Sequence, residues 1–252
     1  MKRALVLVPL LAFGCVFVVE GVTITDVTTS TTVFKDDFET GTFSPSVGSW
    51  SVGPDVTVTN SPMPGAAQGS FYAQLFRNSN NFSQGNLNAN LSSVQATPGD
   101  LIRLDMMVYL PSATDTSAGV QFMLTDGDFN SARAWLQSDG TGNVLAIGPG
   151  FAATDTGLNY LTDTWQLWEL SYVIGSSTFN VSINGAQATG FSSFTTGEVR
   201  VANLFNGNPS PAGSFFLDGV VPEPSTWALL LSGSALLLAV VRSRTRRTTS
   251  DS

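Results

Sequence analysis

The sequence predicts an all-β sandwich placed between two hydrophobic ends. Apolar and polar residues alternate in several segments, which is the period of a half-buried strand. Between Val22 and Val221, no segment keeps the helical period over three turns. Turn-forming Gly, Ser, Thr and Asn recur roughly every eight to twelve residues, a spacing typical of sandwiches built from many short strands.

Residues 1–21 have the features of a secretory signal peptide. A lysine and an arginine follow Met1 and precede an apolar run from Ala4 to Val19. Small or moderate side chains at the end of this run suit cleavage, so we expect the mature chain to begin near Val22. The alternative is a lipoprotein-type cleavage at Cys15, but the apolar run continues beyond that residue.

The exported domain, residues 22–220, is expected to begin with extended chain. A threonine-rich lead-in predicts an edge strand, and Val33 to Glu39 gives the first apolar and polar alternation. The clearest strand is Leu101 to Leu110, with Arg103 and Asp105 on its polar face. The apolar face of this strand carries Ile102, Leu104, Met106, Val108 and Leu110.

Further strands follow with the same period. Apolar residues alternate over 120–124, 168–174 and 179–183, and 214–220 is the last predicted strand. Asn184-Gly185 directly follows the third of these, and this dipeptide favours the type I′ turn of a two-residue hairpin because both positions need positive φ. Asp139-Gly140 marks a second turn.

An asparagine-rich run between the predicted strands is interpreted as a long polar loop. The residues of this run are Asn78, Asn80, Asn81, Asn86, Asn88 and Asn90.

Composition excludes several kinds of chemistry. The chain has no histidine, so Ser-His-Asp and Cys-His catalysis and histidine-ligated zinc are ruled out. Its only cysteine, Cys15, lies in the leader, so the mature domain has no disulfide framework. Between Val22 and Val221, 16 acidic residues face 5 basic ones, and such an acidic surface argues against nucleic-acid binding.

The order of the strand signals resembles the concanavalin A-like or LamG-like jelly roll. The segments that carry this resemblance are D-D-F-E at 36–39, W-Q-L-W-E-L at 165–170, F-N-V-S-I-N-G at 179–185 and F-F-L-D-G at 215–219. The resemblance implies a jelly-roll sandwich whose first and last strands are neighbours. It also implies a structural Ca²⁺ held by Asp37, Glu39 and Asp218. The alternative is that the early acids are edge-strand charges that discourage aggregation.

Trp135 is the candidate ligand-binding residue. In the alternating pattern of this strand, Trp135 points to the opposite side from Ala134 and Leu136. We therefore expect its ring on the outer face of a sheet, where an exposed aromatic ring could stack on a sugar.

Carboxylate catalysis has little support in the sequence. Glycosidases need two carboxyl groups roughly 5 to 9.5 Å apart. The glutamates of the domain, Glu39, Glu169 and Glu198, are scattered, and the Glu-x-Asp-x-x-Glu run of jelly-roll glycosidases is missing. We therefore expect no enzymatic activity.

The C-terminus combines three features in a fixed order. Residues 221–225 are Val221, Pro222, Glu223, Pro224 and Ser225. An uncharged apolar segment, 227–241, follows; at 1.5 Å per residue it forms roughly 22 Å of helix, short but long enough to span a membrane with snorkelling arginines. The basic residues after it, which should stay in the cytoplasm, are Arg242, Arg244, Arg246 and Arg247.

This order resembles the PEP-CTERM sorting signal of Gram-negative bacteria, over residues 221–247. The resemblance implies export, transient anchoring in the inner membrane by a helix over 227–241, and processing by an exosortase-type enzyme. We expect a non-catalytic protein of the cell surface or extracellular matrix, structural or adhesive, in contact with exopolysaccharide. The alternatives are a dedicated carbohydrate-binding module and, less favoured, a glycan hydrolase.

Overall fold

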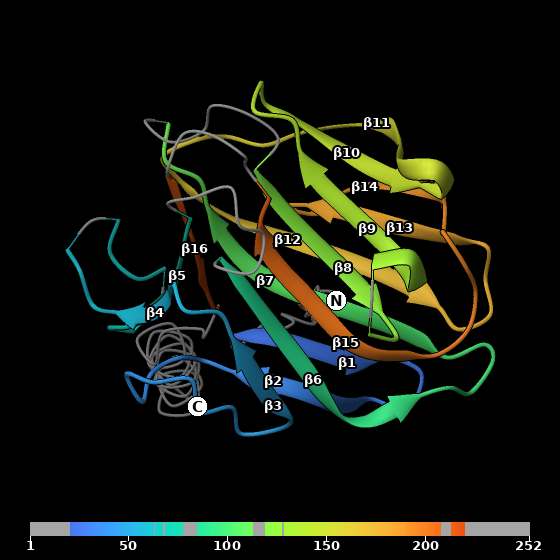
Figure 1. Cartoon of the computed structure of the whole chain (residues 1–252), viewed down its shortest axis with the longest axis horizontal. Coiled ribbons are helices and arrows are strands. Elements are labelled where there is room, and N and C mark those ends of the chain that lie inside the picture. Colours follow the sequence, from blue (N-terminus) through green and yellow to red (C-terminus); the bar gives the residue numbers. More distant parts are fainter. Residues whose placement is uncertain are drawn as a thin grey trace, which may run out of the picture.

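The computed structural model describes residues 21–62, 64–67, 69–77, 85–112, 119–127, 129–207 and 213–219. Within these ranges the chain forms two antiparallel sheets that stack face to face, with β15, β8 and β9 in front of β7, β12 and β13 in Figure 1. Two single-turn 3₁₀ helices, η1 (Phe129–Ser131) and η2 (Pro149–Phe151), are the helical elements of this part of the chain. The predicted all-β sandwich is confirmed.

One sheet has nine strands and the other seven. The nine-stranded sheet has the order β14-β13-β12-β7-β16-β5-β4, with β1 paired to β7 and β2 paired to β1. The seven-stranded sheet has the order β11-β10-β9-β8-β15-β6-β3. The strand bounds are β1 (Val22–Asp26), β2 (Thr31–Asp36), β3 (Ser49–Val52), β4 (Val56–Thr59), β5 (Tyr72–Arg77), β6 (Asn86–Gln95), β7 (Leu101–Tyr109), β8 (Val120–Thr125), β9 (Ala132–Ser138), β10 (Asn143–Gly148), β11 (Ala152–Asn159), β12 (Trp165–Val173), β13 (Thr178–Ile183), β14 (Ala186–Ser192), β15 (Val199–Asn206) and β16 (Gly213–Asp218).

The chain changes sheet repeatedly. It passes from β6 to β7, from β7 to β8, from β11 to β12, from β14 to β15 and from β15 to β16, each time crossing to the other layer. This exchange of strands between two sheets is the jelly-roll arrangement. β1 and β16 both pair with β7, β1 along residues 102–105 and β16 along 107–109, so the first and last strands lie next to the same central strand.

The core lies between the two sheets and consists of the inward residue of each alternating pair. Ile102, Leu104 and Met106 of β7 are fully buried, as their period predicts. Trp168 of β12 fills the middle, with its ring 5.6 Å from Phe122 of β8 in an edge-to-face contact. Burying large aromatic residues supplies much of the hydrophobic stabilisation of such a sandwich.

The hairpin predicted at Asn184-Gly185 joins β13 to β14. Both residues have positive φ, +49° and +83°, which a type I′ turn requires. The predicted turn at Asp139-Gly140 joins β9 to β10, where the Asp139 carboxylate accepts hydrogen bonds from Thr141 and Asn143. Local turn chemistry therefore fixed both connections.

The asparagine-rich run was wrongly interpreted at its C-terminal end. Asn86, Asn88 and Asn90 belong to strand β6, where they alternate with the buried Leu87 and Ala89. Two inward apolar residues outweigh the low strand propensity of asparagine, because burial in the core decides the conformation. The other asparagines of the run lie outside the described residues.

Candidate functional site

The outer face of the seven-stranded sheet carries a second apolar cluster, separate from the core. The strand register places Met123 of β8 opposite Trp135 of β9, and both side chains point away from the core. Ile147 of β10 and Phe205 of β15 join them. Phe194, from the connection between β14 and β15, packs over this cluster. An apolar patch on the outside of a sheet needs either a cover or a ligand.

Trp135 lies on the outer face, as its phase predicts, but its ring is not an exposed platform. Phe194 stacks on it at 5.5 Å with an interplanar angle of 26°, and Phe151 meets it edge-on at 5.8 Å. The indole Nε1 donates a hydrogen bond of 3.1 Å to Gln121 Oε1. Only 6% of the surface of Trp135 is exposed, so its ring packs beneath Phe151 and Phe194 and does not face solvent. The expected exposure is corrected, while its role in ligand binding stays a prediction.

Phe151 is the aromatic residue that this cluster presents to solvent. Its side chain is 59% exposed, and its ring lies 5.3 Å from Phe194. The backbone of Phe151 has φ +61°, directly after Gly150 at +71°. A bulky residue in this left-handed conformation costs roughly 1–2 kcal/mol. Such strain at an exposed aromatic residue points to a role other than stability. We call Trp135, Phe151 and Phe194 the aromatic cluster.

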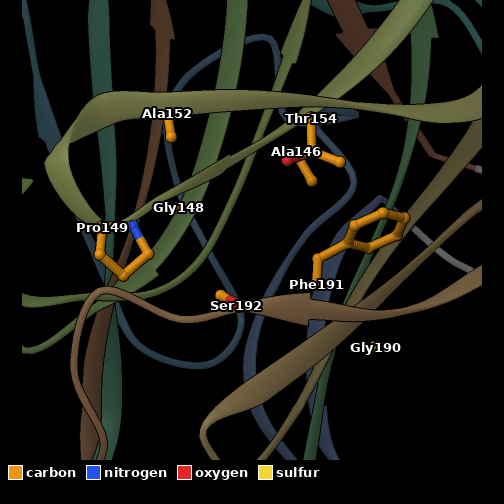
Figure 2. Close-up of a pocket in the computed structure, with 8 residues that line it drawn as sticks. All are labelled: Ala146, Gly148, Pro149, Ala152, Thr154, Gly190, Phe191 and Ser192. Carbon is orange, nitrogen blue, oxygen red and sulfur yellow. The ribbon is translucent and has the colours of Figure 1, made fainter.

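A pocket opens beside the turn η2, on the opposite side of this turn from the aromatic cluster. Figure 2 shows it between the β10–β11 pair and strand β14, with the ring of Phe191 pointing across it toward Thr154. Its volume is about 220 Å³. The lining residues are Ala146, Gly148, Pro149, Ala152, Thr154, Gly190, Phe191 and Ser192. The lining has no charged side chain, so the pocket suits a neutral group that can use two hydroxyls and one aromatic face.

The turn η2 connects the pocket and the aromatic cluster. Pro149 at its start lines the pocket, and Phe151 at its end belongs to the cluster. The two features therefore form one surface around the edge of the sandwich.

Amide side chains continue the outer face away from the aromatic cluster. Asn203 Nδ2 of β15 donates a hydrogen bond of 2.6 Å to Asn88 Oδ1 of β6. Asn90 Nδ2 of β6 donates to Ser51 Oγ of β3 at 3.0 Å. Asn86 Oδ1, in the same outward row of β6, is buried without a hydrogen-bond partner. Rows of amides beside aromatic rings are groups that can bind the hydroxyls of a sugar.

The charge on this face is neutralised. Arg133 of β9 is almost fully buried, and its Nη2 lies 2.8 Å from Asp126 Oδ2. Its other donors bind backbone carbonyls, Nη1 to Ser131 at 2.7 Å and Nε to Glu198 at 3.0 Å. A guanidinium satisfied in this way joins the β8–β9 connection to the start of β15, at one end of the sheet, and leaves little positive charge for an anionic ligand.

The three acids of the predicted calcium site do not form one cluster. Glu39 accepts hydrogen bonds from the backbone N–H groups of Ser70 and Phe71. Asp218 Oδ2 accepts one from Ala67 at 2.6 Å, whereas Asp37 Oδ1 accepts the N–H of Glu39. In the part of the chain that the structure describes, no three acidic side chains come together for a metal ion. Glu39 and Asp218 instead hold the same segment, 67–71, and calcium binding there stays a prediction.

The residues predicted for sorting and anchoring lie outside the described residues. They are Val221, Pro222, Glu223, Pro224, Ser225, Arg242, Arg244, Arg246 and Arg247. Residues 1–20 of the predicted signal peptide and the apolar segment 227–241 also lie outside them. Among the described residues, no helix is long and apolar enough to cross a membrane.

Comparison with known families decides the nature of the C-terminus. Residues 220–247 match the family model of the PEP-CTERM protein-sorting motif. The chain carries a PEP-CTERM sorting signal. This confirms the resemblance that the order of Pro-Glu-Pro, apolar segment and arginines indicated. The motif is a sorting signal, so it accounts for the delivery of the protein and not for the activity of the sandwich. No curated protein matches the chain in sequence.

Comparison with solved structures supports the fold. A sialidase is similar with a TM-score of 0.53 at 11% identity, over 75% of this chain and 18% of the sialidase. The chain thus corresponds to a small part of that enzyme. The carbohydrate-binding module CBM66 from Bacillus subtilis has a TM-score of 0.41 at 9% identity, over 69% of this chain and 94% of its own. The lectin UEA-II, solved in complex with galactose, has a TM-score of 0.45 at 9% identity, over 72% of this chain and 97% of the lectin. The sialidase similarity shows the fold alone, and the lower scores carry no further argument.

Sequence reasoning found Trp135 but missed its partners. Phe151 and Phe194 stand in segments without a clear period, and their contact with Trp135 depends on how two distant connections fold over the sheet. The dipeptide Pro149-Gly150 was the available signal, because it marks a turn that presents the next residue.

Proposed function

We propose that this protein is a non-catalytic component of the cell surface or extracellular matrix, delivered by its PEP-CTERM signal. Residues 1–21 direct export, the segment 227–241 anchors the chain transiently in the inner membrane, and the arginines after it stay in the cytoplasm. An exosortase-type enzyme then removes the anchor near Pro222-Glu223-Pro224. The jelly-roll domain is released to contact exopolysaccharide in a structural or adhesive role.

The observation that carries the polysaccharide contact is Phe151. It is a strained, exposed ring above a buried tryptophan, next to an uncharged pocket and a row of amides. Stacking an aromatic ring on the apolar face of a sugar and binding its hydroxyls through amides is the general chemistry of neutral glycan recognition. The acidic domain disfavours acidic polymers, so a neutral polysaccharide fits this surface best.

The strands that form this face support binding rather than hydrolysis. None of β6, β8, β9, β10 and β15 contains an aspartate or a glutamate, and β11, which also lines the pocket, contains one acid, Asp155. A glycosidase needs a pair of carboxyl groups at the bound sugar, and these strands provide a single one.

The pocket favours one refinement of this function, a dedicated carbohydrate-binding module. A volume of about 220 Å³ has room for a single sugar unit rather than a long chain segment. A module of this kind would bind a defined oligosaccharide end in the pocket. A structural protein would bind the polymer weakly, through the amide row and the aromatic cluster.

The test compares Phe151→Gly with Val173→Ala in a polysaccharide-binding assay with the full chain. Val173 is an exposed apolar residue on the outer face of the other sheet, so it serves as the matched control. We expect Phe151→Gly to lose binding to neutral polysaccharide without loss of stability, because glycine relieves the strain at φ +61°. Binding that survives this substitution, or a wild-type chain that binds no polysaccharide from its host, would contradict the proposal.

A further inference from the structure

The outer face of the nine-stranded sheet carries a row of polar residues that the proposed function does not use. The register places Asp105 of β7 opposite Glu169 of β12, and Glu169 opposite Ser182 of β13. On its other side, Asp105 faces Thr23 of β1. These side chains point away from the core, since their neighbours Leu104, Leu170 and Val181 point into it.

Two oxygen atoms in this row are buried without a hydrogen-bond partner. Asp105 is 1% exposed; its Oδ2 accepts a bond of 2.8 Å from Arg103 Nε, while its Oδ1 has no partner. Ser182 is 5% exposed, and its Oγ has no partner either. Buried polar atoms are nearly always bonded. The carboxyl groups of Asp105 and Glu169 are close enough for a side-chain hydrogen bond between them, but two ionised carboxylates have no proton to share, and a cation between them satisfies both.

The charges in the row also lack balance. Arg103 is the ion-pair partner of Asp105, and no ion pair with a described residue neutralises Glu169. Lys35 of β2 stands beyond Thr23, two strands from Asp105. Asp105 and Glu169 are thus two neighbouring acids, and the ion pair with Arg103 is formed by Asp105.

We propose that Asp105 and Glu169 bind a divalent cation of the hard, oxygen-preferring type, such as Ca²⁺, on this face. Asp105 Oδ1 and the Glu169 carboxylate are direct ligands, because side chains directly opposite on neighbouring strands have Cβ atoms roughly 5 Å apart. Ser182 is about two strand spacings, or roughly 9.5 Å, from Asp105, so its hydroxyl binds a water of the ion. The site joins β7, β12 and β13, and it is separate from the segment that Glu39 and Asp218 hold.

The experiment titrates CaCl₂ and, separately, MgCl₂ into the chelator-treated full chain in a nonionic detergent, with isothermal titration calorimetry as readout. We expect one Ca²⁺ per chain at roughly 10⁻⁴ to 10⁻³ M, the range of extracellular modules. Glu169→Gln should abolish this binding. Glu198→Gln, which changes an exposed acid paired with Arg200, and Glu39→Gln should retain it. Ser182→Ala should weaken it several-fold, and this variant keeps the test valid if Glu169→Gln does not fold.

Binding that Glu169→Gln leaves intact, binding that only Glu39→Gln removes, or no heat with either cation up to about 10 mM would overturn the proposal. None of these outcomes depends on polysaccharide binding, since Phe151 lies on the other sheet.

Discussion

The substitution Asp105→Asn tests how burial of a carboxyl group on the nine-stranded sheet affects stability. The folded-state pKa of Asp105 is about 6, against an ordinary value of 3.8. Because the folded pKa is raised, the stabilisation is complete below about pH 4 and is lost as the pH rises through 6. A shift of roughly two pKa units corresponds to about 3 kcal/mol, so the folded chain loses about this much stability between pH 4 and pH 7 through Asp105.

Asparagine has no charge to bury, so it should remove this part of the pH dependence. Relative to the wild type, Asp105→Asn should become more stable by up to about 3 kcal/mol as the pH rises from 4 to 7. Because Arg103 lowers the pKa of Asp105, its ion pair is already included in the value of about 6 and does not change this pH-dependent difference. The measurement is urea unfolding of the full chain in nonionic detergent with a chelator, followed by tryptophan fluorescence at each pH.

Asp163→Asn is the matched control. Asp163 is exposed, and its pKa is lowered by the hydrogen bonds from Ser112. Its effect therefore has the opposite sign: the asparagine variant should lose stability relative to the wild type as the pH rises. If Asp105→Asn shows the same pH dependence as the wild type, the carboxyl group is not buried as the structure has it, and the reasoning fails.

Two further predictions concern the core and the predicted calcium site. Trp168→Ala removes a fully buried ring that packs against Phe122, and urea unfolding should show a loss of 3 to 5 kcal/mol; a loss below about 1 kcal/mol would mean that the ring is not in the core. Millimolar calcium should raise the melting temperature of Glu169→Gln, which lacks the site proposed above, if Asp37, Glu39 and Asp218 hold an ion, and Glu39→Gln added to this variant should remove the shift. An unchanged melting temperature in calcium would end that prediction.

Periodicity was sufficient for the strands of the core and for the tightest turns. The alternation in 101–110 predicted which side of β7 is buried, and Asn184-Gly185 predicted its hairpin, because both signals act over neighbouring residues. The strand at Asn86 was missed because composition was given more weight than the alternating Leu87 and Ala89. Patterns that depend on local geometry were therefore the reliable ones.

The site could be predicted only in part, because its contacts are between distant segments. The phase of Trp135 correctly placed it outside the core, but the cover provided by Phe194 comes from a connection some 60 residues later in the chain. The opposition of Asp105 and Glu169 depends on the register of β7 and β12, which the sequence alone does not specify. In contrast, the sorting signal could be recognised because its features are contiguous in the sequence.

The most direct test of the account is the intact mass of the protein, isolated from surface and culture fractions of its host with and without the exosortase-type enzyme. The account predicts loss of roughly 25 to 30 C-terminal residues only where the enzyme is present, consistent with removal of a transient membrane anchor. Replacement of Pro222-Glu223-Pro224 by alanines should prevent this loss. An uncleaved C-terminus in both strains would contradict the account, because the apolar segment would then be a permanent anchor.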